Sequence, residues 1–261
     1  MAVRTRQTSG ARRAASAPPR ARRGAERAAS GAVSTLAIDI GGSGLKASVI
    51  DERGNLLVDR VRVETPVGAD PEQIVDALVA VAAPLPPYAR VSVGFPGVVR
   101  DGVVLTAPNL GHEAWRGYDL RRALTVRLER PVRVANDADV QGLAVIEGRG
   151  VEMVVTLGTG FGTGIYLDGR LGPHLELAHQ PFRKGQTYEQ QLGNAARKRI
   201  GDEKWSRRVR RAIRNLRELT TFDRLYVGGG NAKRLTITLD PDVSLVSNRA
   251  GISGGVALWR D

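Results

Sequence analysis

Short apolar runs, each closed by a turn signal, recur along the chain from residue 34 onward. Such runs, bounded by Gly, Asn or Asp, are typical of buried strands. The runs 35–40 and 45–50 are separated by a glycine-rich turn, and Asp168-Gly169 is a hairpin signal after a later run. The pattern predicts strands over residues 35–40, 45–50, 56–63, 91–93, 132–134, 153–157, 165–167 and 225–227.

Other segments carry apolar residues at a spacing of three to four, which predicts helices. The helices are expected over residues 71–82, 120–128, 187–199 and 203–219. The third opens with Thr187 and, three residues later, Gln190, which is the pattern of a capping box. Strands that alternate with helices indicate an α/β protein. Two lobes, each opening with strand, glycine turn and strand, fit this order.

Residues 1–34 differ in composition from the remainder. They hold eight arginines and one acid, so they carry +7 of the formal net charge of +12, and they have almost no large apolar side chain. Such a segment cannot bury enough surface to offset its ordering entropy, so we expect a disordered basic tail. Two interpretations stay open: a solvated extension, or an arm that holds a polyanion electrostatically.

Composition narrows the chemistry. The chain has no cysteine and only three histidines, whose spacing matches no zinc motif, so no zinc is expected, whereas magnesium stays open. No apolar run reaches the roughly 18 residues of a membrane span, and no secretory h-region is seen near the start. We therefore expect a cytoplasmic protein without membrane contact.

Two glycine-rich segments, 41–44 and 158–164, follow apolar strands. A Walker A loop or a dinucleotide fingerprint passes from a strand into a helix, but both segments here are followed by strand-like residues. They are therefore predicted to be hairpin turns whose backbone N–H groups, with the hydroxyls of Ser43 and Thr159, face phosphate oxygens. Either segment alone would be interpreted as an ordinary β-turn, but two such segments, each after an apolar strand, favour the phosphate-binding interpretation.

Several motifs in order carry a family resemblance. Residues 39–46 (DIGGSGLK), 156–162 (TLGTGFG) and 228–231 (GGGN) resemble the two phosphate motifs and the adenosine motif of the hexokinase–actin–heat-shock-70 superfamily. Within it, residues 94–97, 108–110, 136–139 and 176–179 are similar to motifs of the ROK family of bacterial sugar kinases, in particular its polyphosphate glucokinase branch. The resemblance covers about residues 35–261.

This resemblance implies a fold and an activity. The expected fold is α/β, a two-lobed actin-like ATPase (ribonuclease H-like) fold with an interlobe cleft. Its N-terminal lobe would span residues 35–137 and its C-terminal lobe 138–261, with the last helix packing back on the N-terminal lobe. The expected activity is phosphoryl transfer from ATP or polyphosphate, or both, to the 6-hydroxyl of glucose. A homodimer is also expected.

Site residues follow from the matched motifs. Asp137 would be the base that takes the proton from the sugar hydroxyl, although an Asn-Asp pair by itself equally predicts a helix N-cap. Asp39 would orient magnesium through water. The sugar ligands would be Asn109, Asn136, Glu176 and His179. The residues expected to bind the phosphate donor are Asp39, Gly41, Gly42, Ser43, Gly44, Lys46, Thr156, Gly158, Thr159, Gly160, Gly228 and Gly229.

Two of these positions have a second interpretation. Lys46 could be a solvated strand residue instead of a phosphate ligand. Ala178 stands where the family's Glu-x-Gly-His motif has glycine, which leaves the sugar specificity open.

A dense run of basic residues extends from the end of the third predicted helix through most of the fourth. Few acids interrupt it, so salt bridges along the helix do not account for it. It is either the solvated face of an amphipathic helix or a track for polyphosphate; specific nucleic-acid binding is not expected, because aromatic residues are few. The run comprises Arg197, Lys198, Arg199, Lys204, Arg207, Arg208, Arg210, Arg211, Arg214 and Arg217.

Three other functions would share some of these sequence features. A ROK-type transcriptional repressor would need a helix-turn-helix domain of about sixty residues before the first phosphate motif, and thirty-four residues do not supply it. A catalytically inactive sugar- or polyphosphate-binding protein is disfavoured by the presence of Asp137. A kinase for mannose, fructose or an N-acetylhexosamine stays open.

Overall fold

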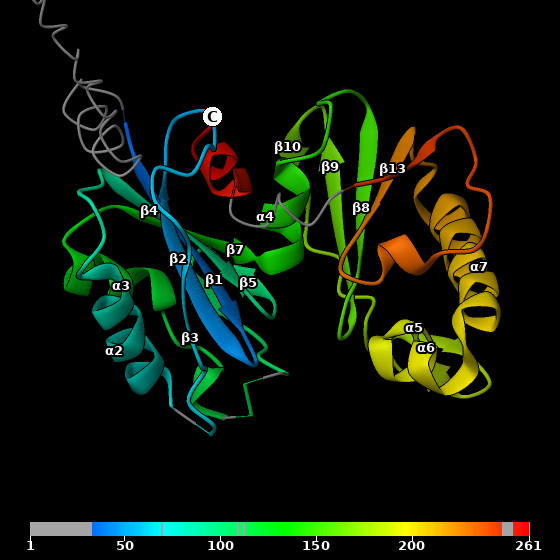
Figure 1. The fold of residues 1–261 in the computed structure, drawn as a ribbon, viewed down its shortest axis with the longest axis horizontal. Helices are drawn as coiled ribbons and strands as arrows, with labels where there is room; N and C mark the ends of the chain where they lie inside the picture. Colours follow the sequence, from blue (N-terminus) through cyan, green and yellow to red (C-terminus); the bar gives the residue numbers. More distant parts are fainter. Residues whose placement is uncertain (1–32, 69, 109, 112, 247–252, 261) are drawn as a thin grey trace, which may run out of the picture.

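The computed structural model describes residues 33–68, 70–108, 110–111, 113–246 and 253–260. Two five-stranded sheets stand side by side, each with helices on its outer face (Figure 1). The first has the order β3-β2-β1-β4-β7 and the second β10-β9-β8-β13-β14. The strands of the first sheet are β1 Thr35–Gly41, β2 Gly44–Ile50, β3 Val61–Val63, β4 Arg90–Phe95 and β7 Val132–Asn136. Those of the second are β8 Val151–Leu157, β9 Phe161–Leu167, β10 Arg170–Leu171, β13 Arg224–Gly228 and β14 Val243–Leu245.

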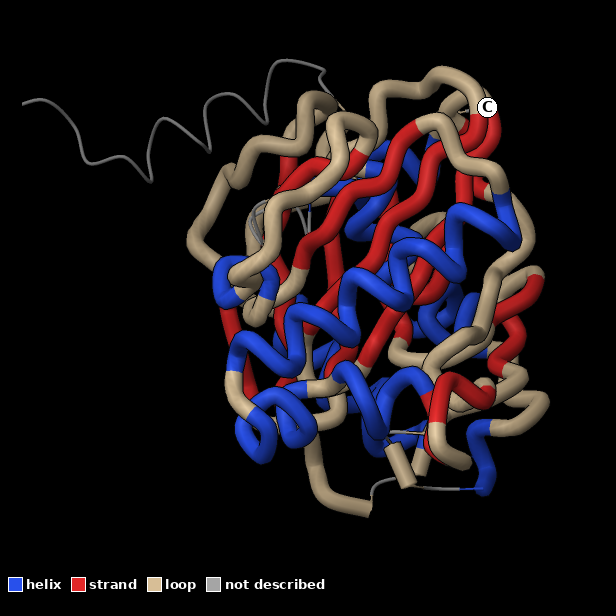
Figure 2. Tube along the Cα trace, turned by 90° about the vertical axis from the view of Figure 1, so that its right-hand side faces the viewer, coloured by secondary structure: helices blue, strands red, loops and turns tan. Residues whose placement is uncertain are grey.

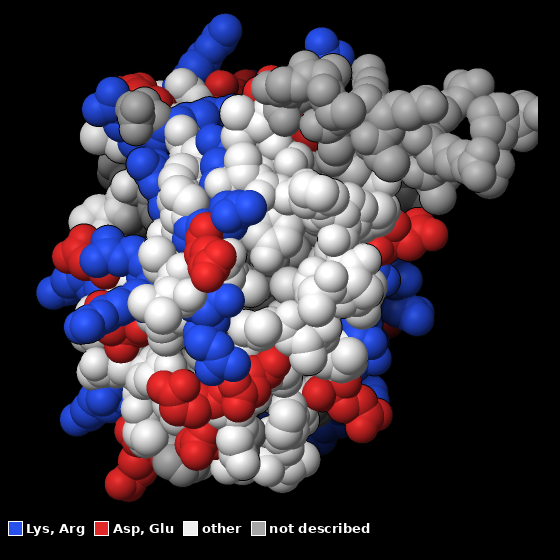
Figure 3. All heavy atoms as spheres, turned by 90° about the vertical axis from the view of Figure 1, so that its left-hand side faces the viewer, with Lys and Arg blue, Asp and Glu red and all other residues white. Residues whose placement is uncertain are grey.

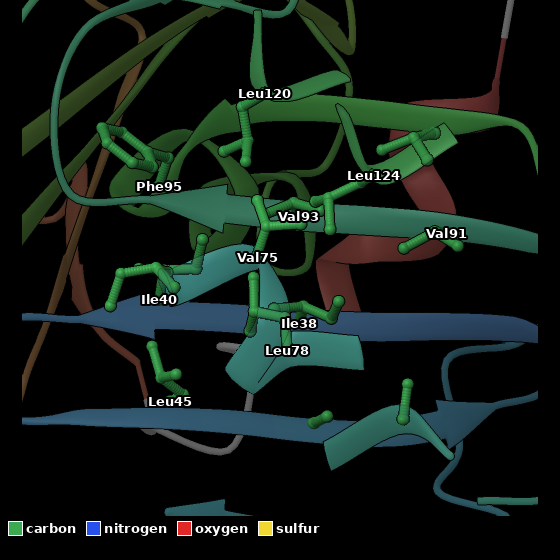
Figure 4. Packing of buried hydrophobic residues seen from close by; sticks show 14 of the residues in the cluster. Ile38, Ile40, Leu45, Val75, Leu78, Val91, Val93, Phe95, Leu120 and Leu124 are labelled. Carbon is green, nitrogen blue, oxygen red and sulfur yellow. The ribbon is translucent and has the colours of Figure 1, made fainter. Parts of the chain in front are cut away.

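Helices α2 (Pro71–Ala82) and α3 (Leu120–Leu128) cover the first sheet, with the bounds that the sequence predicts. Asp70 caps α2: its carboxylate accepts from Gln73 N at 2.8 Å, and the Gln73 side chain accepts from Asp70 N at 3.1 Å. The apolar face of α2 packs on β1, β2 and β4, as Figure 4 shows for Val75 and Leu78 beside Ile38. This burial makes the first sheet and its helices one core.

The second sheet is covered by α5 (Tyr188–Leu192), α6 (Asn194–Ile200) and α7 (Asp202–Thr220). Figure 2 shows α7 lying across the sheet. Its apolar stripe is buried from Trp205 to Leu216, whereas Leu219 at the end of the helix is exposed. The capping box predicted at the start of α5 is present. The prediction of one helix over 187–199 is wrong, because Gly193 is extended and separates α5 from α6. A side chain at Gly193 would lie 2.5 Å from Thr159 O. The glycine at this break therefore allows the backbone to pack closely against the second glycine loop.

One predicted strand is also shorter than expected. Residues 56–63 form β3 only at Val61–Val63, while Leu56 makes an isolated bridge to Ile50. The remaining elements are two small hairpins and short helices: β5 Val99–Arg100, β6 Val103–Val104, β11 Pro181–Arg183, β12 Gln186–Thr187, α4 Asp137–Leu143, η1 Glu113–Trp115, η2 Ala232–Arg234 and η3 Gly254–Trp259. No helix among the described residues is both long and apolar enough to cross a membrane.

The 3₁₀ helix η3 near the C-terminus returns to the first sheet and packs on β1, β4 and α4 (Figure 1). Ser92 joins it to β4: its hydroxyl donates to Gly255 O at 2.6 Å and accepts from Trp259 Nε1 at 2.8 Å. Gly254 lies so close to α4 that a side chain there would meet Val140 O. The chain end thus helps to hold α4, the element between the two sheets.

Candidate active site

Three parallel strands of the first sheet end at the same edge. In the register, Asp39 of β1 lies opposite Gly94 of β4, and Phe95 lies opposite Asn136 of β7. Because the carboxyl ends of parallel strands meet at one edge, Asp39 and the residue after β7, Asp137, come together there.

Helix α4 begins at this edge. The sequence left open whether the Asn-Asp pair caps a helix or carries the catalytic base, and the structure gives these two positions different places. Asn136 is the N-cap: its Oδ1 accepts from Ala138 N at 2.8 Å, and its Nδ2 donates to Gly97 O at 3.0 Å. Asp137 is the first helical residue and lies partly buried. The Asp137 carboxylate therefore lies at the helix start, where the helix dipole favours negative charge; its Oδ1 accepts from Ala138 N at 2.8 Å, which leaves Oδ2 for a ligand.

Both glycine segments are hairpin turns, as predicted from their flanks, but the second turn is shorter than expected, because residues 161–164 already belong to β9. Gly41 pairs with Gly44 at the end of the β1–β2 hairpin, and Leu157 pairs with Phe161 across the β8–β9 turn.

The third glycine segment supports the β8–β9 turn. Gly229 has φ +89°, and a side chain there would lie 2.4 Å from Leu157 N, so only glycine suits this approach. Beyond it, Asn231 donates from Nδ2 to Gly158 O at 3.0 Å. The adenosine-like segment is thus packed directly on the second glycine loop.

A cleft of about 730 Å³ lies between the lobes and is lined by both glycine loops. The predicted site residues that line it are Asp39, Gly41, Gly42, Ser43, Lys46, Asn136, Asp137, Thr156, Gly158, Thr159, Gly160, Glu176, His179 and Gly229. Gly44 and Gly228 are not among the lining residues: Gly44 packs against the Arg62 guanidinium and Gly228 against Val246. Asn109 lies outside the described residues.

Charge is concentrated on the first-sheet side of the cleft. Burial, followed by the negative charge of Asp39, raises the pKa of Asp137 to about 7. Lys46 lies opposite Asp39 in the β1–β2 register, and its Nζ is 2.8 Å from Asp39 Oδ2. Lys46 is therefore not simply solvated: it is half-exposed, lines the cleft and partly neutralises Asp39.

Beside the cleft, the predicted sugar ligand Glu176 is joined to two charged residues, His174 and Asp139, for which the sequence predicted no role. His174 Nδ1 is 2.9 Å from Asp139 Oδ2, and His174 Nε2 is 3.5 Å from Glu176 Oε2. The Asp139 side chain is only 3% exposed and that of His174 11%. Burial alone would lower the pKa of His174, but the hydrogen bond to Asp139 and the ion pair with Glu176 outweigh burial and raise it to about 9. The imidazole is therefore a cation at neutral pH.

Glu189 also lines the cleft, although the sequence predicted no role for it. It lies in the first turn of α5 and lines the cleft beside Gly160. A side chain at Gly160 would meet Glu189 Oε2 at 2.4 Å, so the glycine makes room for this carboxylate. In the sequence, the capping box beside Glu189 indicated a helix start but not a position in the cleft.

The basic run is less uniform than the sequence suggested. Arg197 Nη1 pairs with Asp202 at 2.8 Å, and Arg217 pairs with both Asp240 and Asp242. The interpretation that salt bridges do not account for the run is therefore wrong at these two positions. The others make no ion pair within the described ranges; we call them the α6–α7 basic run: Lys198, Arg199, Lys204, Arg207, Arg208, Arg210, Arg211 and Arg214.

The ROK family model matches residues 35–182 of this chain. The chain belongs to the ROK family. Among ROK proteins, it is 31% identical over 224 residues to the polyphosphate glucokinase of Mycobacterium leprae, covering 81% of this chain and 67% of that protein. It is 30% identical over 224 residues to the polyphosphate glucokinase of Mycobacterium tuberculosis H37Rv, covering 82% and 83%.

Solved ROK structures share the fold. The inorganic polyphosphate/ATP-glucomannokinase of Arthrobacter sp. strain KM superimposes with a TM-score of 0.77 and 35% identity, covering 86% of this chain and 97% of that chain. A ROK family glucokinase from Streptomyces griseus, solved with glucose and AMPPNP, gives a TM-score of 0.70 at 23% identity over 86% and 98%. These matches confirm the family and the two-lobed actin-like fold that the motifs predicted.

Proposed function

We propose that this ROK protein is a glucokinase that transfers a phosphoryl group from polyphosphate, ATP or both to the 6-hydroxyl of glucose. The observation that carries the proposal is the cleft itself, where Asp137 faces two glycine hairpin loops. Similarity to polyphosphate glucokinases over four fifths of the chain supports the same activity.

Asp137 acts as the general base. The sugar oxygen attacks the terminal phosphorus of the donor, its proton passes to the Asp137 carboxylate, and the bond from phosphorus to the leaving phosphate oxygen breaks. A base works best when its pKa is near the working pH, and a pKa of about 7 meets that condition. The proton then leaves to solvent.

The glycine loops receive the donor. Their backbone N–H groups, with the hydroxyls of Ser43 and Thr159, suit the phosphate oxygens, and Lys46 adds a positive charge at the same edge. Glycine at these positions keeps the backbone accessible to a phosphate chain.

Magnesium fits this edge as an ion brought in with the phosphates. The described residues contain no group of three or more metal-ligating side chains, so they offer no all-protein cage. Mg²⁺ commonly keeps several waters and takes one or two carboxylates plus substrate phosphates, and Asp39 can supply such a carboxylate through water. When bound, the ion neutralises phosphate charge that builds up in the transition state.

Glu176 and His179 are the sugar ligands that the cleft supports best. Both line it, and together they offer a hydrogen-bond acceptor and an imidazole to the sugar hydroxyls. Asn136 also lines the cleft, but its amide is engaged by Ala138 N and Gly97 O. Its contribution is therefore to fix the start of the helix that carries Asp137.

The α6–α7 basic run is a path for the polyphosphate chain. Helix α6 starts against the second glycine loop, where Asn194 N donates to Gly158 O at 3.1 Å. Farther along, Arg208 Nη1 is buried without a hydrogen-bond partner in the described residues, and burial, followed by the charges of Arg183 and Arg199, lowers the pKa of Arg208. A bound polyanion would satisfy this nitrogen and relieve the repulsion. By contrast, the outer face of the N-terminal lobe carries interspersed positive and negative side chains (Figure 3).

The decisive experiment offers glucose and magnesium with ATP and long-chain polyphosphate in separate reactions and measures glucose 6-phosphate. Product is expected with at least one donor, and the Asp137→Asn variant should lose about a thousandfold or more in kcat while still binding glucose. No product with either donor would refute the glucokinase proposal. Mannose belongs in the same assay, because the Arthrobacter relative is a glucomannokinase.

The path of the donor is tested separately with Arg208→Gln, using Arg217→Gln as the matched control on the same helix. The Arg208 substitution should raise the KM for polyphosphate about threefold to tenfold and reduce its salt dependence, with the KM for ATP unchanged. Equal effects of both substitutions would remove α7 from the donor path without touching the kinase proposal. The cytoplasmic location and the homodimer stay predictions.

A further inference from the structure

His174 belongs to a buried ionic chain that links the two halves of the site. Asp139 lies on α4, two residues after Asp137, whereas Glu176 lies on the segment after β10. The imidazole bridges them, with Nδ1 2.9 Å from Asp139 Oδ2 and Nε2 3.5 Å from Glu176 Oε2. It is the one side chain in the described residues for which ion pairs to both carboxylates are seen.

The Asp139 end of the chain is rigid. Asp139 is 2% exposed, and beneath it the Tyr166 hydroxyl donates to Asp139 O at 2.8 Å. Burial raises the pKa of Asp139 despite the hydrogen bond from His174, so this carboxylate depends on its cation to stay charged. His174 is accordingly fixed by α4.

The Glu176 end of the chain is adjustable. Its side chain is 31% exposed and lines the cleft, and its main local bond is a long one, from Ala178 N to Oε1 at 3.3 Å. On the other side, the Thr163 hydroxyl donates to Leu175 O and ties the backbone of this segment to β9. The backbone is thus held by β9, while the direction of the Glu176 carboxylate depends on His174.

We propose that His174 is a positioning residue for the sugar: anchored on Asp139, it aims the Glu176 carboxylate at the sugar site and so sets the sugar in register with Asp137. This inference rests on the proposed function, since it takes a sugar to be what Glu176 binds. The charges that face His174 are Asp139 and Asp137 from α4 and Glu176 from its own segment, with His179 beyond Glu176.

The first test is the His174→Ala variant with separate KM values for both substrates. The KM for glucose should rise about tenfold or more, because a charge-assisted contact on Glu176 is lost, with the KM for the donor unchanged. The acid limb of the pH profile should also move to higher pH, since the positive charge of His174 lowers the pKa of Asp137. Tyr166→Phe is the matched control: it loosens α4 beneath Asp139 but leaves the ionic chain intact, so it should lower stability and keep the KM for glucose.

A double-mutant cycle gives the decisive comparison. If His174 acts through Glu176, His174→Ala should add less than about twofold to the KM for glucose once Glu176→Gln is present. Independent effects in the cycle, or an unchanged KM for glucose in His174→Ala, would overturn the proposal.

A double variant and a binding measurement separate a failure of this inference from misfolding and from a failure of the proposed function. If His174→Ala fails to fold because Asp139 is left without its cation, the Asp139→Asn/His174→Ala pair removes both charges and should show the same rise in KM; a normal KM there overturns the proposal. Calorimetric titration of the wild-type protein with glucose separates this inference from the proposed function. If the wild type neither binds nor phosphorylates glucose, the proposed function is refuted. If the wild type is active and His174→Ala has a normal KM for glucose, only the positioning role of His174 is refuted.

Discussion

The pH dependence of the reaction follows from the surroundings of Asp137. Its pKa is about 7 because burial penalises the carboxylate and because Asp39 places a second negative charge nearby. An aspartate with an ordinary pKa of 3.8 would be almost fully ionised from pH 5 upward. With a pKa of about 7, only about a tenth of the protein holds the reactive carboxylate at pH 6, and about a hundredth at pH 5.

The expected result is therefore a steep acid limb. The kcat/KM for glucose, measured at saturating donor and constant ionic strength, should fall about tenfold per pH unit below 7. Because a phosphate donor also titrates near pH 6, the residual rate of Asp137→Asn is the control, and it should lack the limb that belongs to Asp137. A kcat/KM that stays flat down to pH 5 in the wild type would refute the reasoning.

The raised pKa of Asp137 also predicts how the free energy of unfolding depends on pH, and this dependence is opposite to that of the activity. A raised pKa means that folding favours the protonated carboxyl, so the contribution of Asp137 to stability is full below pH 4 and is lost as the pH rises through 7. Asp137→Asn should thus be more stable than the wild type at pH 8, by about 2–4 kcal/mol, and equal to it near pH 4. Urea unfolding at both pH values checks this; a variant that is less stable at pH 8 would contradict the assigned burial of the charge.

Three substitutions test buried contacts of the fold by urea unfolding. Glu152 is fully buried and accepts from three main-chain N–H groups and a tyrosine hydroxyl, so Glu152→Gln, which turns one acceptor oxygen into a donor, should cost about 3 kcal/mol; a loss below 1 kcal/mol would contradict this. Trp259→Phe removes the hydrogen bond to Ser92 and should cost about 1 kcal/mol, whereas unchanged stability would show that η3 is held by other contacts. Gly142→Ala would put a methyl group 1.8 Å from Tyr166 Oη and should cost more than about 2 kcal/mol, part of which Tyr166→Phe in the same chain should restore.

Elements with strong local signals were predictable from the sequence. Helix α2 begins where Asp70 and Gln73 form a capping box, with Pro71 as the first helical residue, and its bounds match the prediction. The two glycine hairpins follow from their flanks, because a strand pattern on both sides leaves room only for a turn. The break at Gly193 was missed, since it depends on the close approach of Thr159 O from a loop that is distant in the chain.

The functional reading of Asp137 needed several motifs together. By itself, the Asn-Asp pair fits a helix cap, and Asn136 is indeed the cap of α4. Only the order of the phosphate motifs around it pointed to catalysis. The sequence thus indicated which residues gather at the cleft.

The sequence by itself determined the alternation of strands and helices, the glycine hairpins and the family, because these depend on neighbours within a few residues or on motifs in order. Tertiary structure decided the electrostatics. The pKa of Asp137 depends on burial and on Asp39, almost a hundred positions earlier, and the charge of His174 depends on Asp139, 35 positions away. The counter-ions of Arg217 come from a segment more than twenty residues beyond it. Such effects act over a few ångströms through space, so they appear only once the chain has brought these groups together.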